Sequence, residues 1–191
     1  MMEPIRTARL TLRNWEERDR ALFHRINSDK QVMEFFGILR SRAESDELFD
    51  RLRGNIDRDG YGFTAAEIAA TGECIGFVGI NPTDLAPFIP KGTMEIGWRL
   101  APEFWGKGYV TEASEAWLTY CFETLKLGEV VSFAVWNNHR STAVMKRLAM
   151  RHDPSRDFDH PRVPDTQPEL KRHVYYRLSQ AEWQQRKKAA T

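Results

Sequence analysis

A strand, a glycine-containing turn and a long helix follow one another between residues 93 and 125. Apolar side chains alternate along 93–100, which predicts a strand. Residues 101–108 combine proline, tryptophan and two glycines, which is typical of a turn, and 111–125 carry apolar residues at helical spacing. An apolar strand is expected over 130–136. This β-α-β unit should have parallel strands and a right-handed crossover.

The rest of the chain adds both kinds of element. Alternation and turn signals predict strands over 5–13, 60–69, 74–81 and 173–178. Helical spacing predicts helices over 16–28, 43–59, 138–150 and from Ser179, with Glu182 completing a capping box, and a short piece at 29–36. The early hairpins should be antiparallel. The expected fold is α/β, of mixed α+β character, with a mixed, twisted sheet and helices on both faces.

Length and charge narrow the function classes. The usual domain size favours a single domain for 191 residues. Twenty-eight Lys and Arg against 27 Asp and Glu leave a net charge of +1, which argues against a nucleic-acid or membrane-surface binder. The longest apolar run, 75–80, is too short to span a membrane, and the first residues lack a signal peptide's apolar stretch. A cytoplasmic protein is expected.

The two cysteines, Cys74 and Cys121, match neither a zinc signature nor a disulfide framework. They are interpreted as small buried hydrophobic residues, and no metal site is indicated. No covalent nucleophile is evident. A group-transfer reaction, if the protein catalyses one, is therefore expected to proceed by direct attack of one substrate on the other in a ternary complex with the protein.

The turn around Gly106 and Gly108 is a candidate anion site. Glycine reaches backbone angles that bring several N–H groups towards one point, and the following helix adds its N-terminal N–H groups and dipole. Together they would cradle a pyrophosphate, with Lys107 adding charge. A plain tight connection explains the same pattern. The spacing is neither a dinucleotide fingerprint nor a Walker loop.

In this segment the chain resembles the GNAT N-acetyltransferases, close to the RimJ/RimL-type branch of ribosomal-protein N-terminal acetyltransferases. The resemblance covers nearly the whole chain, 1–191, as one domain with a frayed end at 185–191. It is most specific over 98–113 and resumes at 7–13, 27–37, 137–141, 146–151 and 157–161. Trp105 and Val110 depart from the family's Gln/Arg-x-x-Gly-x-Gly/Ala pattern at its two ends.

The resemblance implies acetyl-CoA as the acyl donor. It places the pantetheine arm along the backbone of one strand, the pyrophosphate on the turn, and the thiol end near the start of the next helix. The implied cofactor residues are Trp98, Arg99, Leu100, Trp105, Gly106, Lys107, Gly108, Tyr109, Val110, Thr111, Asn138 and Ser141.

Two residues are candidates for proton transfer. Acyl transfer needs a neutral amine, and Glu95 lies by alternation on the strand face opposite Met94 and Ile96, where the resemblance implies a base. A solvated or ion-paired strand glutamate is the alternative. The position of the family's usual acidic Tyr holds Met145, which leaves Ser141 as candidate acid; a hydroxyl bonded to the helix backbone is its alternative.

The acceptor side is less defined by the sequence. The candidate substrate-binding residues are Phe35, Phe36, His160 and Tyr176. The alternative interpretations are core aromatic residues and a loop histidine. The RimJ/RimL likeness suggests a protein N-terminus as acceptor. A small-molecule amine is the enzymatic alternative, and a coenzyme-A-binding module without turnover is the alternative from another class. A homodimer is compatible with the sequence.

Overall fold

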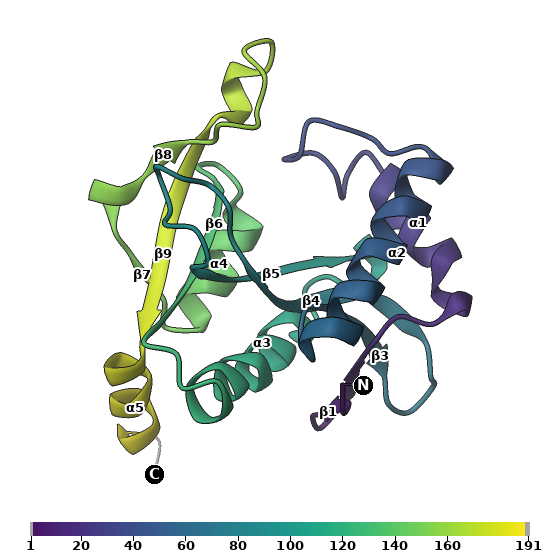
Figure 1. Cartoon of the computed structure of the whole chain (residues 1–191), viewed down its shortest axis with the longest axis horizontal. Helices are drawn as coiled ribbons and strands as arrows, with labels where there is room; N and C mark the ends of the chain where they lie inside the picture. Colours follow the sequence, from purple (N-terminus) through teal and green to yellow (C-terminus); the bar gives the residue numbers. More distant parts are fainter. Residues whose placement is uncertain (1, 190–191) are drawn as a thin grey trace. The chain divides into compact units, whose positions relative to one another are not determined.

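The computed structural model describes residues 2–189 (Figure 1). The chain divides into two compact units, residues 1–81 with 97–116 and residues 82–96 with 117–191. The boundary falls within strand β5 (Met94–Leu100) and helix α3 (Tyr109–Thr119), which contribute to both. Nine strands make up a mixed sheet, which confirms the expected α/β class.

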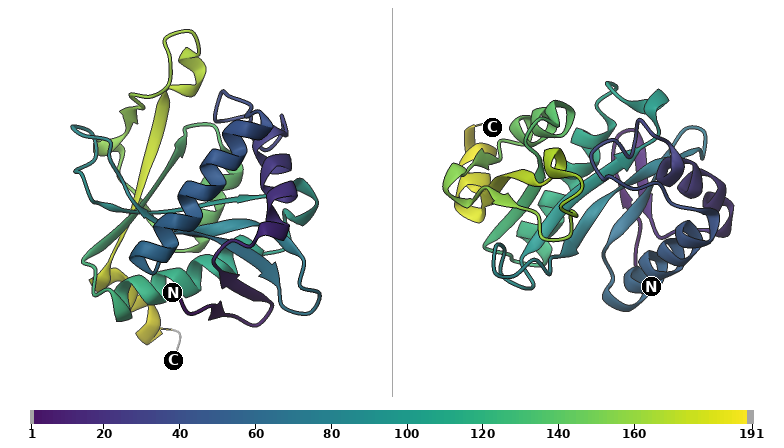
Figure 2. Two further views of the ribbon diagram at one scale, coloured as in Figure 1. Left: turned by 45° about the vertical axis from the view of Figure 1, so that its right-hand side comes forward. Right: turned by 90° about the horizontal axis from the view of Figure 1, so that it is seen from above.

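The first unit begins with a four-stranded antiparallel meander. Its strands are β1 (Ile5–Arg6), β2 (Leu10–Arg13), β3 (Phe63–Ile68) and β4 (Cys74–Pro82). Helices α1 (Arg20–Ser28) and α2 (Arg42–Asp59) connect β2 to β3 and lie side by side (Figures 1 and 2). A capping box begins α2 at Ser41, and Gly60 ends it at a left-handed φ of 77°.

Aromatic side chains hold these helices against the meander. Trp15 contacts Phe23 of α1 at 4.9 Å and Phe49 of α2 at 5.4 Å between ring centroids, and both Trp15 and Phe23 reach Phe77 of β4. The indole N–H of Trp15 donates to the Phe63 carbonyl at 2.8 Å. The ring pairs bury large apolar areas, and the hydrogen bond satisfies the indole inside the core.

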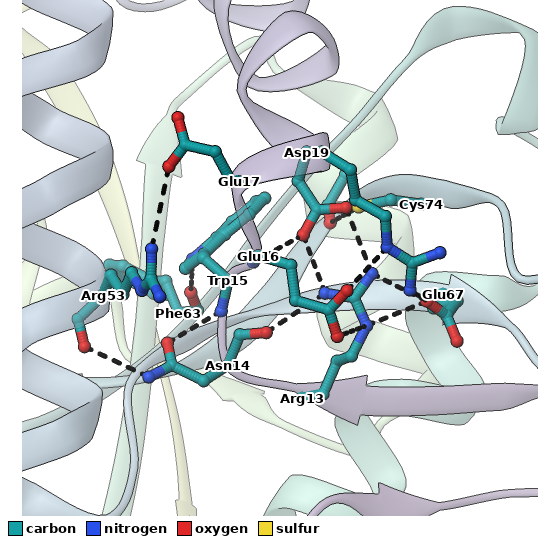
Figure 3. Close-up of polar contacts among 12 residues, drawn as sticks. Arg13, Asn14, Trp15, Glu16, Glu17, Asp19, Arg53, Phe63, Glu67 and Cys74 are labelled. Atoms are coloured by element: carbon teal, nitrogen blue, oxygen red, sulfur yellow. Dashed lines mark hydrogen bonds and ion pairs between the residues drawn. The ribbon is translucent and has the colours of Figure 1, made fainter.

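A charged cluster lies close to Trp15 in the same unit (Figure 3). The Arg13 guanidinium is buried and pairs with Asp19 at 2.7 Å and with Glu67 at 2.7 Å. The hydrogen bonds and charges of these two carboxylates outweigh the effect of burial and raise the pKa of Arg13. The charge of this buried arginine is thus balanced by two carboxylates.

The second unit is built on the parallel pair that the β-α-β pattern predicts. Glu95 of β5 is the register partner of Val131 in β6 (Glu129–Val135), and α3 connects the two strands. Strand β9 (Arg172–Ser179) runs antiparallel to β6, and it also pairs with β7 (Arg151–His152) and β8 (Phe158–Asp159). Helices α4 (His139–Arg147) and α5 (Gln180–Ala189) complete the unit.

Four predicted elements differ in detail. The strand expected over 5–13 is a tight hairpin of β1 and β2, and the residues of 29–36 form turns. The helix over 111–125 changes to a π-helical turn at Tyr120–Thr124. Strand β8 lies in a segment where no strand was predicted, and α5 includes 185–189 of the expected tail; 190 and 191 lie outside the described residues. No helix within 2–189 is long and apolar enough to cross a membrane.

Candidate active site

The turn before α3 presents unpaired N–H groups. Gly106 and Gly108 have φ angles of 73° and 80°, which L-residues with a side chain rarely adopt. The first backbone bond of the helix runs from the Glu112 N–H to the Gly108 carbonyl at 3.1 Å. The N–H groups from Tyr109 to Thr111 have no acceptor within residues 2–189. This arrangement, with Lys107 exposed beside it, can bind an anion such as a pyrophosphate.

Arg9 and Glu112 fix the turn, and the sequence interpretation missed both. Arg9 donates from Nη1 to the Lys107 carbonyl at 2.9 Å and from Nε to Glu112 at 2.6 Å, and its guanidinium stacks over Tyr109 at 4.6 Å. Glu112 also accepts from Thr7. Burial alone would raise the pKa of Glu112, but the hydrogen bonds from Thr7 and Arg9 lower it. The signal available in the sequence was an acid in the first helical turn.

The end of β5 leads directly into this turn. The Trp105 indole donates to the Leu100 carbonyl at 2.9 Å and ties the turn to the strand. A Cβ at Gly76 of β4 would lie 2.3 Å from the Arg99 carbonyl oxygen, so only glycine allows this close approach. The backbone of residues 98–100 is therefore positioned by Trp105 and by Gly76.

The side chain of Arg99 is half-buried in the first unit. Its guanidinium lies 4.0 Å from the Phe36 ring centroid and 5.3 Å from that of Phe77, and it donates to the Asn27 side-chain oxygen. Burial lowers the pKa of Arg99 to about 9, and nearby Arg40 lowers it as well. The guanidinium keeps its charge at neutral pH.

Glu95 has an altered pKa. Its carboxyl accepts no hydrogen bond and forms no ion pair within residues 2–189, although part of the side chain remains exposed. Burial raises its pKa to about 8, and the charge of Arg162 opposes this only weakly. Above about pH 8 this group is a carboxylate, which can accept a proton from an ammonium group. Of the two alternatives, the ion-paired strand glutamate does not apply, and the partly exposed side chain is compatible with the solvated one.

Register places Glu95 on a defined sheet face within the second unit. Its partner Val131 shares that face with Phe133 by alternation, and Tyr175, opposite Phe133, lies there too. His173, opposite Val135, continues the face. Tyr176 pairs with Ser132 and so lies on the other face, where it stacks on His152 at 5.0 Å.

His160 packs against this face. Its ring lies 4.8 Å from that of His173 and 6.2 Å from that of Phe133. Burial lowers the pKa of His160 to about 4, with His173 and Arg162 contributing, so the ring is neutral at pH 7. Its Nδ1 accepts from the Arg162 backbone N–H at 3.2 Å, which leaves the proton on Nε2.

Asn138 caps the start of α4. The Asn138 side-chain oxygen accepts from the Ser141 N–H at 3.1 Å. The Ser141 hydroxyl has no hydrogen-bond partner within residues 2–189. Met145, whose side chain has no donor group, is buried. The neighbouring Asn137 has a buried side-chain oxygen without a donor, a second acceptor that the sequence interpretation missed.

The predicted site residues thus fall into two groups. The first unit holds Arg99 with Phe36 and the turn before α3, and the second holds Glu95 with His160, and Asn138 with Ser141. Phe35 is half-buried in the turns after α1. Within residues 2–189, no cluster of three or more His, Cys, Asp or Glu could hold a metal ion.

Comparison with known proteins identifies the family. The model of the acetyltransferase (GNAT) domain matches residues 9–151. YkkB of Bacillus subtilis, an uncharacterised protein, is 31% identical over 147 residues, 76% of this chain and 84% of that protein. An acetyltransferase structure from Agrobacterium tumefaciens has 30% identity and a TM-score of 0.74, and the match covers 93% of this chain and 95% of that one.

Two more distant structures share the fold and were solved with coenzyme A. RimL, a ribosomal alpha-N-protein acetyltransferase, has 17% identity and a TM-score of 0.72, covering 93% of this chain and 98% of its own. A spermidine N-acetyltransferase from Vibrio cholerae, bound to CoA and spermine, has 19% identity and a TM-score of 0.71, covering 93% and 99%. The family match, together with the N–H-rich turn that follows β5, identifies the chain as a member of the GNAT family and an acetyl-CoA-dependent acyltransferase.

Proposed function

We propose that the protein transfers the acetyl group of acetyl-CoA to a primary amine by direct attack, with Glu95 as the general base. The observation that carries this proposal is the pKa of about 8 at Glu95, raised by burial and left without an ion-pair partner. An N-terminal amine has a pKa near 8, and a lysine-type amine has one of roughly 10.4. Glu95, with a pKa of about 8, matches the N-terminal amine in strength and is a weaker base than the lysine-type amine.

Acetyl-CoA binding is assigned to the turn and the strand before it. The pyrophosphate would accept hydrogen bonds from the N–H groups of the turn, and the pantetheine arm would pair with the backbone of β5 as an added strand. A strand N–H would polarise the thioester carbonyl. The residues assigned are Trp98, Arg99, Leu100, Trp105, Gly106, Lys107, Gly108, Tyr109, Val110, Thr111, Asn138 and Ser141.

The reaction needs no enzyme-bound acyl intermediate. Burial raises the pKa of both Cys74 and Cys121 to about 12, so neither thiol ionises appreciably at pH 7. The amine nitrogen forms the new bond to the thioester carbon, its proton passes to Glu95, and the carbon–sulfur bond breaks. The thiolate of CoA leaves with a pKa near 8.5 and needs little help. The Ser141 hydroxyl is assigned as its hydrogen-bond donor.

Two acceptor types fit this chemistry. The RimL likeness favours a protein N-terminus, and the spermidine acetyltransferase likeness favours a small-molecule amine. Phe36 and His160 are assigned to the acceptor side, since Phe36 is largely exposed and His160 lies against the Glu95 face of its unit. We keep the N-terminal acceptor as the first choice.

Calorimetry and thiol release test the proposal together. Acetyl-CoA is titrated into the wild type, Glu95→Gln and Glu73→Gln, in which an exposed glutamate serves as the matched control. Free thiol is then measured with N-terminal peptides and small amines. All three proteins should bind acetyl-CoA, and only Glu95→Gln should lose turnover, by about 10²–10⁴-fold. Undiminished turnover of Glu95→Gln removes the base, and failure of the wild type to bind removes the donor assignment.

A further inference from the structure

Two arginine side chains of the first unit contain buried nitrogen atoms without partners. The Nε atoms of Arg99 and Arg40 are both buried, and neither has a hydrogen-bond acceptor within residues 2–189. Each arginine also lacks an ion pair with any carboxylate in this part of the chain. Buried polar atoms are almost always satisfied in folded proteins, so two such atoms together need an explanation.

The surroundings of Arg99 contain neutral groups and one further cation. Phe36 and Phe77 lie against its guanidinium, and Asn27 accepts from Nη1. The other charge that acts on it is Arg40, which is also positive and lowers the pKa of Arg99. The rings and the amide oxygen stabilise the guanidinium but supply no negative charge.

Glu44, a carboxylate whose pKa Arg40 affects, is already committed to other hydrogen bonds. Arg40 helps to lower the pKa of Glu44, but the main causes are hydrogen bonds from the Ser41 backbone and hydroxyl. These bonds measure 2.7 and 2.9 Å to the Glu44 carboxylate, and the first of them belongs to the capping box of α2. Glu44 therefore serves the helix terminus and leaves Arg40 without an ion pair.

Arg13 is the comparison, because it is a buried arginine with counter-ions. Arg13 has two carboxylate partners, Asp19 and Glu67, and a raised pKa (Figure 3). Arg99 has no carboxylate partner and a lowered pKa. A buried charge without a counter-ion is unfavourable in the free protein, and an incoming anion would remove that cost.

We propose that Arg99 and Arg40 bind an anionic group, a carboxylate or a phosphate, on the amine acceptor. Phe36 is 48% exposed and stacks on Arg99, so the guanidinium lies close to the protein surface. The planar guanidinium can hold a carboxylate through two parallel hydrogen bonds. Arg99 also belongs to β5, the strand assigned to the acyl donor. The inference rests on the proposed function and narrows its acceptors to amines that carry a negative charge.

Matched acceptor pairs test the charge directly. Thiol release is measured with peptides that begin with Asp or Asn, and with glutamate and glutamine as small amines. The first pair supplies the anion from a peptide and the second from a small molecule. The wild type should prefer the anionic member of at least one pair by about tenfold or more in kcat/KM. The pair that shows the preference identifies the source of the anion.

Variants locate the preference. Arg99→Met should lower the anionic-to-neutral ratio of kcat/KM by about tenfold or more, mostly through KM, and Arg99→Lys should restore part of it. Arg42→Met is the control, since Arg42 is exposed and pairs with Asp46 at 2.9 Å. The substitution removes the same charge at a nearby position. It should leave the ratio unchanged. Because the same two acceptors are compared in every protein, differences in amine basicity cancel.

A binding measurement separates this inference from the proposed function. The Nε–H signals of Arg99 and Arg40 are followed by NMR in ¹⁵N-labelled protein while each acceptor is added. Anionic acceptors should shift both signals and neutral ones should not. Equal kcat/KM for both members of each pair, with equal shifts, overturns the inference and leaves the acetyl transfer standing. Acetyl-CoA binding without thiol release from any amine overturns the proposed function, and the NMR shifts then decide the anion site by themselves.

Discussion

Arg9 and Glu112 join the N-terminal hairpin to the first turn of α3 through a 2.6 Å ion pair. The same carboxylate accepts from the Arg9 backbone N–H at 2.7 Å and from Thr7 at 2.6 Å, and Arg9 also holds the Lys107 carbonyl. Residues more than 100 positions apart thus fix the turn assigned to the pyrophosphate. Such positioning matters for a site that binds through backbone N–H groups, because the turn itself has few side chains to hold it.

Removal of Arg9 should loosen this turn. Arg9→Met should raise the Kd of acetyl-CoA by roughly three- to tenfold, with a loss of stability below about 1 kcal/mol because the pair is partly exposed. Calorimetry and thermal unfolding measure the two effects. Arg6→Met, which removes an exposed arginine of β1, is the control and should change neither. Equal affinity of Arg9→Met and wild type would contradict the role of Arg9.

A side chain at Gly108 should interfere with donor binding. Gly108 has a φ of 80°, and a Cβ there would lie 3.3 Å from Arg9 Nη2. Gly108→Val should therefore raise the Kd of acetyl-CoA by about tenfold or more, as calorimetry can measure. Gly54→Ala in α2, where a Cβ meets no atom within 4 Å, should bind normally and gain up to about 1 kcal/mol of helix stability. Normal binding by Gly108→Val would refute the assignment of the turn.

The activity of the wild type should rise with pH through the pKa of Glu95. Below about pH 8 the carboxyl is protonated and cannot accept the proton of the amine. The profile of kcat/KM should therefore show an ionisation near pH 8 that Glu95→Gln lacks. The ionisation of the amine appears in both proteins and serves as the internal reference. A profile of the same shape in both proteins would exclude Glu95.

The ionisation of Glu95 that raises the activity should lower the stability of the folded protein as the pH rises. The pKa of Glu95 is raised in the folded protein, from 4.5 to about 8, so between these values the folded state retains a proton that the unfolded state has lost. The free energy of unfolding contributed by this group therefore falls as pH rises through that range. Relative to the wild type, Glu95→Gln should gain Tm between about pH 5 and about pH 8. A constant Tm difference would show that the pKa is not raised.

The Arg13 cluster should be important for stability. Asp19 is 2% exposed, and Asp19→Ala removes one of two carboxylates from a buried guanidinium. We expect a loss of about 3 kcal/mol and a fall in Tm on the order of 10 °C. Glu17→Ala, which removes an exposed carboxylate from an ion pair with Arg20, should cost less than about 1 kcal/mol. Similar losses in both variants would contradict the importance of burial in this cluster.

The sequence predicted the elements with periodic burial correctly. The parallel pairing of β5 and β6 followed from the β-α-β pattern, and the capping box at Ser179 from Ser179 and Glu182. The hairpin at 5–13 was missed because its turn, residues 7–9, contains no Gly, Pro, Asn or Asp to signal it. The π-helical turn after Thr119 was missed because it keeps the apolar spacing of a helix.

The sequence indicated candidate site residues only where a local motif contains them. The turn of Gly106 and Gly108 and the glutamate on β5 are contiguous in sequence, so a resemblance could locate both. Arg9 and Arg40 act through tertiary contacts with residues far along the chain, and no periodicity indicates such partners. The raised pKa of Glu95 likewise depends on what surrounds the carboxyl, which the sequence of one strand does not contain.

Asn27 links the two arginines of the anion site through two different atoms. Its backbone carbonyl accepts from the Arg40 N–H at 2.9 Å, and its side-chain oxygen accepts from Arg99. Asn27 is itself fully buried and donates to the Phe23 carbonyl at 2.7 Å. The two cations are therefore energetically coupled, and the effects of Arg40→Met and Arg99→Met on acceptor affinity will not add. The two arginines should bind the anion as one unit, and loss of either should remove the anion response of that unit.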